Sequence, residues 1–264
     1  MLLEGKNAII YGAGGGIGPA VAKAFVREGA KVFLVGRTKA KLDKVAAEVK
    51  AAGGSAEVAV FDVLDEKAVE DHLRGVVATA GSVDISFNLV SRGDVQGIPL
   101  IDMKVEDYTR AVVNGLSAQF ISARAAARQM SEQKSGVILM ITSASSAGAV
   151  PMMGSTPAAD AAMESFMRCF AAEVGANGIR VVGIWTAGVA ETLTPANIAE
   201  VNSSMQLDEA GVQQIVQAIS QMTMLKRPIV LSQVVETATF LASDRASGIT
   251  GTIVNVTSGL VAVG

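Results

Sequence analysis

The sequence predicts an α/β protein, a single doubly wound parallel sheet of seven strands with helices on both faces. Short apolar runs alternate with helical stretches of ten or more residues, which is typical of βαβ units. Most of these runs are almost continuously apolar, as expected for strands that helices cover on both sides. A glycine-rich turn directly follows the first run, where a doubly wound fold has its first strand-to-helix connection.

The strands are predicted from apolar runs of five to seven residues that end in a turn or a charge. We expect them near 7–11, 31–35, 56–61, 84–88, 136–142, 179–185 and 252–256. Helical periodicity predicts helices near 16–29, 38–52, 65–80, 104–131, 156–176, 195–224 (interrupted) and 231–243. Gly29 and Gly53 follow the first two helices, where glycine adopts the left-handed conformation easily. His72 lies on the third helix, and we expect it to be solvated.

We find no linker, so residues 1–264 are expected to form one domain. Within it, 186–225 is the least regular segment, with Pro195 and many Gln and Met residues. Either this segment is a substrate loop over a site, or it is an ordinary exposed pair of helices. The sequence leaves both interpretations open.

Composition excludes several classes of function. The formal net charge is −3 with both signs interspersed, which argues against nucleic acid or a membrane surface as partner. No apolar run reaches the roughly 18–20 residues of a membrane span, and the first strand begins too early for a targeting peptide. The single cysteine, Cys169, forms no internal disulfide, which fits the cytoplasm. One cysteine and one histidine make a metal site unexpected.

The turn after the first strand has the composition of a phosphate-binding loop. It runs Tyr11-Gly12-Ala13-Gly14-Gly15-Gly16-Ile17-Gly18-Pro19. Residues without a Cβ allow a tight strand-to-helix turn, and they let backbone N–H groups approach a pyrophosphate at the positive end of a helix. We interpret it as a Rossmann-type dinucleotide loop. The alternative is a plain glycine-rich turn.

Several motifs, in order along nearly the whole chain, resemble the short-chain dehydrogenase/reductase family. The family's T-G-x-x-x-G-x-G loop matches Gly12, Gly16 and Gly18. The later matches are Asp62-Val63, Asn88-Leu89-Val90-Ser91, Ala187-Gly188-Val189-Ala190-Glu191-Thr192, Phe240-Leu241-Ala242-Ser243-Asp244, Ile249-Thr250-Gly251 and Val256-Thr257-Ser258-Gly259. The resemblance implies strand order 3-2-1-4-5-6-7, a nicotinamide cofactor and a small-molecule substrate. It also implies a homotetramer or homodimer with helices 104–131 and 156–176 at interfaces.

The resemblance assigns a set of residues to the dinucleotide. These are Gly12, Gly14, Gly15, Gly16, Ile17, Gly18, Arg37, Asp62, Val63, Asn88, Gly188, Val189 and Thr192. Cofactor choice depends on the end of the second strand, where a carboxylate would select NAD(H) and repel a 2′-phosphate. This chain has Arg37 there, and a guanidinium binds phosphate through paired hydrogen bonds. We therefore expect NADP(H) rather than NAD(H), unless Arg37 is only a solvated charge at the start of a helix.

The family's catalytic tyrosine and lysine have no counterpart here. Aligning the strand and helix places Ser143 in the family's Ser position, Thr156 in the Tyr position and Asp160 in the Lys position. A register shifted by two residues would select Ser145 instead, but it still recovers no Tyr or Lys. The family's Asn on the long helix maps to Gly115, with Asn114 one residue away. Only Tyr11 and Tyr108 exist in the chain, and both lie elsewhere.

Two interpretations fit the altered positions. In one, Thr156 is an N-cap, Pro157 is the first helical residue, and Asp160 lies in a first turn that favours negative charge. In the other, Ser143, Thr156 and Asp160 form a different polar site beside the nicotinamide. A threonine hydroxyl cannot replace a phenol as an acid near neutral pH, so carbonyl reduction by the family mechanism should be slow or absent.

Three functions are consistent with the sequence. The first is an NADP(H)-dependent oxidoreductase for a carbonyl or alcohol with an altered acid–base site. The second is a catalytically inactive dinucleotide-binding protein, acting as a sensor or as a partner in an oligomer. The third is a structural paralogue with an empty site, which the retained loop and Asp62 disfavour. Trp185, Met152 and Met153 either line an apolar substrate pocket or fill the core.

Overall fold

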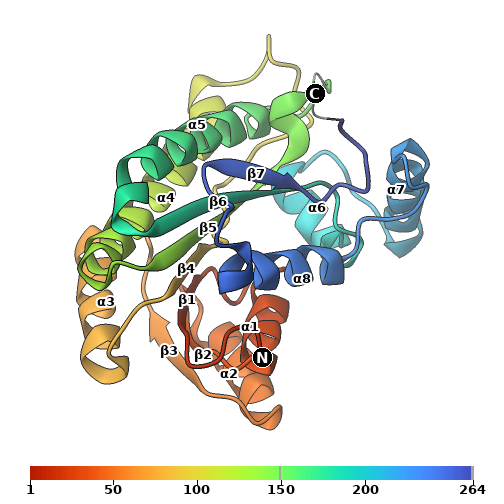
Figure 1. Ribbon diagram of the computed structural model, residues 1–264. Coiled ribbons are helices and arrows are strands. Elements are labelled where there is room, and N and C mark those ends of the chain that lie inside the picture. The colour runs from red at the N-terminus through yellow and green to blue at the C-terminus, as the bar shows by residue number, and fades with distance from the viewer. Residues whose placement is uncertain (149, 263–264) are drawn as a thin grey trace.

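One parallel sheet organises the chain in the computed structural model, which describes residues 1–148 and 150–262. Its seven strands lie in the order β3-β2-β1-β4-β5-β6-β7, which confirms the predicted topology (Figure 1). The strands are β1 Asn7–Tyr11, β2 Lys31–Gly36, β3 Ala56–Val60, β4 Ile85–Asn88, β5 Gly136–Ser143, β6 Ile179–Thr186 and β7 Thr252–Asn255. The strand order reverses between β1 and β4: β2 and β3 extend to one side of β1, and β4 to β7 extend to the other. The carboxyl ends of β1 and β4 therefore form the crevice where such folds bind ligands.

The helices lie close to their predicted ranges. They are α1 Gly18–Arg27, α2 Lys39–Ala51, α3 Glu66–Ala80, α4 Val105–Gln133, α5 Thr156–Val174, α6 Pro195–Val201, α7 Glu209–Met222 and α8 Leu231–Ala242. Helix α1 begins two residues later than expected because the glycine turn extends through Ile17. Gly29 and Gly53 have φ of +94° and +81°, so both take the left-handed position predicted after their helices.

Two hydrophobic clusters pack on opposite faces of the sheet. On one face, Phe25 of α1 stacks on Phe87 of β4 with 6.5 Å between ring centroids, and α2 and α8 complete the layer. On the other face lie α3, α4 and α5, with Met167 among the buried residues. Alternation along β1 sends Ile10 to the first cluster and Ile9 to the second. Helices therefore cover both faces, as the continuous apolar strands predict.

His72 is not solvated as expected. It lies on α3 against Phe61 and Phe33, with ring centroids 5.3 Å and 6.4 Å away. Its Nδ1 is buried and has no hydrogen-bond partner among the described residues. Burial lowers the pKa of His72 to about 4, although Glu57 opposes the shift. The helical pattern places His72 at the edge of the apolar stripe, and the aromatic side chains of β2 and the β3 end enclose it.

The segment 186–225 contains the helix pair α6 and α7, joined by 202–208. Helix α7 projects from the right of the molecule in Figure 1, and only Val212 and Ser220 of it are buried. The end of α6 is tied to the loop after β4, because the Gln96 N–H donates to the Val201 carbonyl at 2.7 Å.

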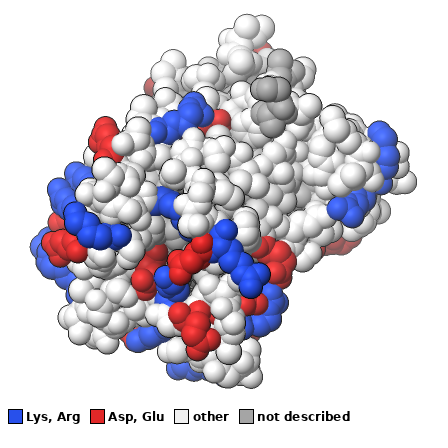
Figure 2. All heavy atoms as spheres, viewed as in Figure 1, with Lys and Arg blue, Asp and Glu red and all other residues white. Residues whose placement is uncertain are grey.

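Positive and negative side chains are interspersed over the face shown in Figure 2, and Cys169 is free and exposed. Throughout the described ranges, none of the helices is long and apolar enough to cross a membrane. Nor do the same residues contain a group of three or more His, Cys, Asp or Glu side chains placed to hold a metal ion.

Candidate functional site

A cavity of about 570 Å³ opens at the carboxyl ends of β1, β2 and β4. Seven residues predicted to bind the dinucleotide line it: Gly12, Gly14, Gly15, Gly16, Arg37, Asp62 and Val63. They come from the turns after three neighbouring strands, which the sheet order brings to one edge. The cavity also includes Asn114 of α4 and Glu200 of α6.

The glycines of the loop serve two different purposes. Gly12 has φ +75°, and a Cβ there would lie 2.6 Å from the carbonyl carbon of Leu89. A Cβ on Gly18 would lie 2.6 Å from the Cα of Ala13. These two glycines are therefore required by the fold itself.

At Gly15 and Gly16 a side chain would fill the cavity rather than clash with the fold. A Cβ on Gly15 would meet only the Gly12 carbonyl oxygen, at 3.2 Å. A Cβ on Gly16 would approach only the Thr192 side chain, with 3.2 Å to its Cγ2. Both residues line the cavity, so side chains there would fill space that bare backbone now leaves for a ligand. This glycine cradle fits a pyrophosphate.

Two cations near the end of β2 line the cavity. Arg37 Nη1 lies 3.7 Å from Asp62 Oδ2, which is too long for a hydrogen bond and leaves the guanidinium donors free. Lys41 of α2 lines the same cavity. The sequence interpretation missed Lys41, which lies in the first turn of α2, whereas Arg37 precedes the helix.

The remaining predicted cofactor residues do not line the cavity. Asn88 is buried, and its side chain links α4 to the loop after β4. Its Nδ2 donates to Ser122 Oγ at 3.0 Å, and its Oδ1 accepts from the Val90 N–H. Ile17 and Gly18 form the start of α1. Gly188, Val189 and Thr192 follow β6 on the other side of the glycine loop. Of these three, Thr192 approaches the loop most directly, through Gly16.

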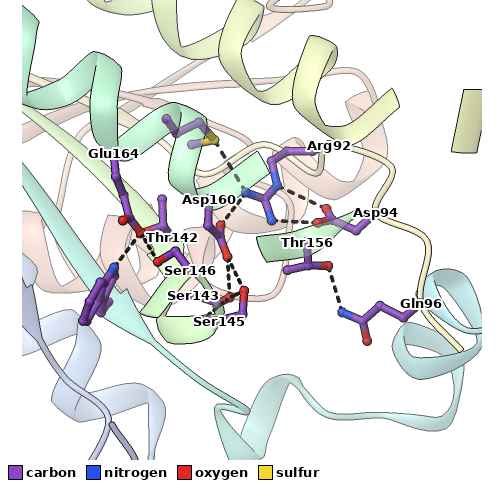
Figure 3. Close-up of polar contacts among 12 residues, drawn as sticks. Arg92, Asp94, Gln96, Thr142, Ser143, Ser145, Ser146, Thr156, Asp160 and Glu164 are labelled. Atoms are coloured by element: carbon purple, nitrogen blue, oxygen red, sulfur yellow. Dashed lines mark hydrogen bonds and ion pairs between the residues drawn. The ribbon is translucent and has the colours of Figure 1, made fainter. Parts of the chain in front are cut away.

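Ser143 and Asp160, predicted as catalytic positions, are brought together (Figure 3). Ser143 ends β5, and its Oγ donates to Asp160 Oδ2 at 2.5 Å. Ser145 in the short turn that follows also donates to Oδ2, at 2.9 Å. The Asp160 side chain has no exposed surface, whereas both serines are partly exposed. Asp160 therefore contacts both of the serines that the two alignments select.

A buried guanidinium completes this cluster. Arg92, in the loop after β4, donates from Nη1 to Asp160 Oδ1 at 2.6 Å. Its Nε and Nη2 bind the two oxygens of Asp94 at 3.1 Å and 2.7 Å. Burial lowers the pKa of Arg92, but Asp160 and Asp94 raise it by more, so the net shift is upward. The sequence interpretation missed Arg92 and Asp94, since neither matches a family motif.

Thr156 lies apart from the cluster and is not an N-cap. Helix α5 begins with Thr156 itself, the N-cap is Ser155, and Pro157 occupies the second helical position. The Ser155 hydroxyl accepts a hydrogen bond from the Val95 N–H at 3.0 Å, in the loop after β4. It makes no capping hydrogen bond to the backbone of α5. Thr156 Oγ1 accepts from Gln96 Nε2 at 3.0 Å. Asp160 accepts hydrogen bonds from Arg92 and the two serines, and it lies beyond the first turn of the helix.

A second buried carboxylate lies one turn further along α5. Glu164 Oε1 accepts from Thr142 Oγ1, Ser146 Oγ and Trp185 Nε1 at 3.1, 2.7 and 2.6 Å. Trp185 is therefore a buried hydrogen-bond donor to α5. Met152 is exposed beyond the end of β5. Figure 3 shows the Glu164 group and the Asp160 group as separate networks on the same helix.

The hydroxyl–carboxylate–guanidinium chain of Ser143, Asp160 and Arg92 lies outside the lining of the glycine-loop cavity. The chain's two tyrosines, Tyr11 and Tyr108, lie in β1 and α4, so this chain of hydrogen bonds contains no phenol. Asp160 accepts hydrogen bonds from three donors, so its carboxylate joins the loop after β4 to the end of β5.

Comparison with known proteins agrees with the fold and the motifs. A family model described as enoyl-(acyl carrier protein) reductase matches residues 12–261. Gluconate 5-dehydrogenase of Gluconobacter oxydans (strain 621H) is 28% identical over 258 residues, which cover 98% of this chain and 95% of that protein. The 7alpha-hydroxysteroid dehydrogenase of Escherichia coli (strain K12) is 30% identical over 257 residues, or 97% and 94% of the two chains.

A solved structure gives the same result in three dimensions. It is a 7 alpha-hydroxysteroid dehydrogenase complexed with NADH and 7-oxo glycochenodeoxycholic acid. Its TM-score to this chain is 0.84 at 30% identity, over 97% of this chain and 94% of that one.

Proposed function

The chain belongs to the short-chain dehydrogenase/reductase family, and we propose that it is an NADP(H)-dependent oxidoreductase with an acid–base site of its own. Its relatives act on hydroxyl or carbonyl groups of small molecules, and we assign this chain to the same substrate class. The observation that carries the proposal is the glycine cradle beside a basic strand end, with a fully paired polar cluster in the catalytic position.

The cradle of Gly15 and Gly16 supports dinucleotide binding, as does the related structure that holds NADH. The nicotinamide ring supplies or accepts the hydride when such a cofactor is bound. Arg37 and Lys41 favour the 2′-phosphate of NADP(H), because both cations line the cavity and Arg37 lies too far from Asp62 for a hydrogen bond. Gly188, Val189 and Thr192 extend the site on the β6 side.

The catalytic cluster argues against an inactive protein. An abandoned site is under no constraint to keep three charges together, yet the side chains of Arg92 and Asp94 after β4 and of Asp160 on α5 are only 13%, 13% and 0% exposed. Burying charges is costly unless they are paired, and buried pairs add little net stability. The competing proposal is a dinucleotide-binding protein without redox activity, which the missing phenol–ammonium pair favours.

We also propose that residues 1–264 act as one domain in the cytoplasm and that 186–225 contacts a small, apolar substrate. The tie between Gln96 and Val201 supports the role of this segment, because it joins α6 to the loop that carries Arg92. Exposed apolar side chains on α4 support a homodimer or homotetramer, among them Val113 and Phe120 at 59% and 41% exposure.

A fluorescence titration of NADPH and NADH tests the cofactor, followed by turnover of a panel of secondary alcohols and ketones. Arg37→Asp and Lys41→Glu should each weaken NADPH binding by about 10–100-fold, the equivalent of one or two charged hydrogen bonds. NADH binding should change little. Lys39→Glu is the matched control, because Lys39 pairs with Asp43 and does not line the cavity. Equal affinity of the wild type for both cofactors would reject the NADP(H) preference.

A further inference from the structure

Two partly exposed hydroxyls contact the buried Asp160 carboxylate. Asp160 Oδ1 is bound by Arg92, whereas Oδ2 accepts from Ser143 and Ser145. The carboxylate has no exposed surface, so a ligand in the site would meet the serines first. Ser143 stands at the carboxyl end of β5, where doubly wound folds present groups to their ligands.

The hydrogen-bond direction at Ser143 determines what the residue can do. A serine hydroxyl has one proton, and Ser143 Oγ has two acceptors for it within the cluster, Asp160 Oδ2 at 2.5 Å and Ser145 Oγ at 2.8 Å. Ser143 can therefore accept a hydrogen bond from a substrate hydroxyl, but it cannot at the same time donate one to a substrate carbonyl. This arrangement favours removal of a proton from an alcohol over delivery of a proton to a ketone.

Arg92 fixes the carboxylate that would receive the proton. Its fork of Nε and Nη2 is held by both oxygens of Asp94, which leaves Nη1 aimed at Asp160 Oδ1. The orientation of Asp160 is thereby set, with Oδ2 turned toward the serines (Figure 3). Arg92 does not touch the hydroxyls by any described hydrogen bond, so its role would be to position Asp160.

We propose that Asp160 is the proton acceptor for oxidation of a neutral secondary alcohol, with Ser143 as the relay and Arg92 as the positioning residue. The inference rests on the proposed function. The substrate O–H proton passes to Ser143 Oγ while the Ser143 proton passes to Asp160 Oδ2. The O–H electron pair forms the carbonyl bond, and the C–H bond breaks as hydride to the NADP⁺ oxidant. The products are a ketone, neutral Ser143 and protonated Asp160.

The charge of the cluster sets the substrate class. Arg92 contributes one positive charge against Asp94 and Asp160, and Glu164 adds a buried carboxylate one turn along α5. This excess of negative charge disfavours a substrate carboxylate close to the reacting carbon. Neutral alcohols should therefore be oxidised in preference to hydroxy acids of the same size.

The first experiment compares variants for alcohol oxidation and for NADP(H) binding. Ser143→Ala and Asp160→Asn should each lower kcat by about 10²–10⁴-fold, the usual worth of general base catalysis, with dinucleotide affinity unchanged. Ser146→Ala is the matched control: Ser146 lies in the same short turn, but its hydroxyl binds Glu164. It should retain wild-type kcat.

Arg92 is tested by a conservative and a non-conservative change. Arg92→Met should lower kcat at unchanged KM, because the carboxylate loses its orientation while the substrate contacts remain. Arg92→Lys keeps one charged donor toward Asp160 and should recover part of kcat. If Arg92→Met alters only the melting temperature, Arg92 is a structural residue and its assigned role is wrong.

A readout without turnover tests the relay even if a variant folds poorly. Infrared spectra of the cofactor-free protein with ¹³C-labelled aspartate report the Asp160 carboxylate, assigned by its loss in Asp160→Asn. The band should shift in Ser143→Ala and stay in place in Ser146→Ala. An unshifted band in Ser143→Ala, or wild-type turnover in that variant, overturns the relay and leaves the proposed function intact. A wild type that binds NADP(H) but oxidises and reduces nothing overturns both.

Discussion

The backbone of Gly115 lies directly against the side chain of Arg92. A Cβ on Gly115 would be 2.6 Å from Arg92 Cδ and 3.1 Å from Met163 Sδ. The sequence alignment predicts that Gly115 on α4 stands in the family's Asn position and that Asp160 on α5 stands in its Lys position. The Arg92 side chain passes between the two helices and binds Asp160 at 2.6 Å. Gly115 of α4 and Asp160 of α5 therefore both contact one guanidinium side chain from a third element.

Gly115→Ala should lower stability, against the usual effect of this substitution in a helix. Alanine normally gains about 1 kcal/mol over glycine in a helix interior. Here the new methyl group would push on Arg92, which cannot move without weakening two ion pairs, so we expect a net loss of about 1–3 kcal/mol. Gly75→Ala on α3 is the control: nothing lies within 4 Å of its Cβ position, and it should gain stability. Urea unfolding of both variants measures the difference, and equal gains would contradict the packing argument.

Acidification should destabilise the protein through His72. Burial lowers its folded pKa from 6.5 to about 4, so the unfolded chain binds the proton more tightly. The contribution is fully present above pH 6.5 and is lost as the pH falls toward 4. At about 1.4 kcal/mol per pKa unit, the loss reaches about 3 kcal/mol at most.

The measurement compares unfolding free energies of the wild type and His72→Gln between pH 7.5 and 4. Glutamine does not titrate, so the two curves should converge as the pH falls and the wild type loses the His72 contribution. Parallel curves would show that His72 is solvent-accessible enough to keep an ordinary pKa.

The outer face of α4 and α5 should hold the oligomer together. Phe120 packs edge-on against Phe166 at 5.8 Å, and Phe166 stacks on Phe170 at 5.1 Å between ring centroids. Phe120 is still 41% exposed, so a partner subunit can bury it. Phe120→Asp should convert a dimer or tetramer to a monomer in light scattering, because a charge in an apolar interface is costly. Lys67→Asp on α3 provides a control for charge alone. A wild type that is monomeric at micromolar concentration would disprove the interface.

The fold could be predicted from the sequence because its signals are local. Each strand is an apolar run, and Gly12 and Gly29 mark turns whose φ values only glycine adopts easily. The site could be predicted only where the signal is equally local, as for Gly16 and Arg37. Arg92 could not be found in this way, because its partner Asp160 is 68 residues distant in sequence and they meet only in the folded sheet. His72 was misjudged for the same reason: Phe33 and Phe61, which enclose it, come from other elements.

Restoring the family's catalytic pair should require a third change. From sequence alone, Thr156→Tyr with Asp160→Lys places a phenol and an ammonium one helical turn apart. In the structure, the new ammonium would face Arg92 in a buried position, leaving only Asp94 to balance two cations. Replacing one member of a buried pair costs about 3–5 kcal/mol, so the double variant should be destabilised and inactive.

Adding Arg92→Ala removes the competing cation and opens the space beside Gly115 that its side chain now fills. We expect the triple variant Arg92→Ala, Thr156→Tyr, Asp160→Lys to reduce a small ketone with NADPH at least about tenfold faster than the double variant, the low end of general acid catalysis. Its melting temperature should also exceed that of the double variant. The melting temperature reports whether packing is repaired, and the turnover rate reports whether the chemistry is repaired. Arg92→Ala alone is the control and should gain no reductase activity, because it has neither the phenol nor the ammonium. If the double variant is as stable and as active as the triple, then Arg92 is not what keeps a lysine out of this site.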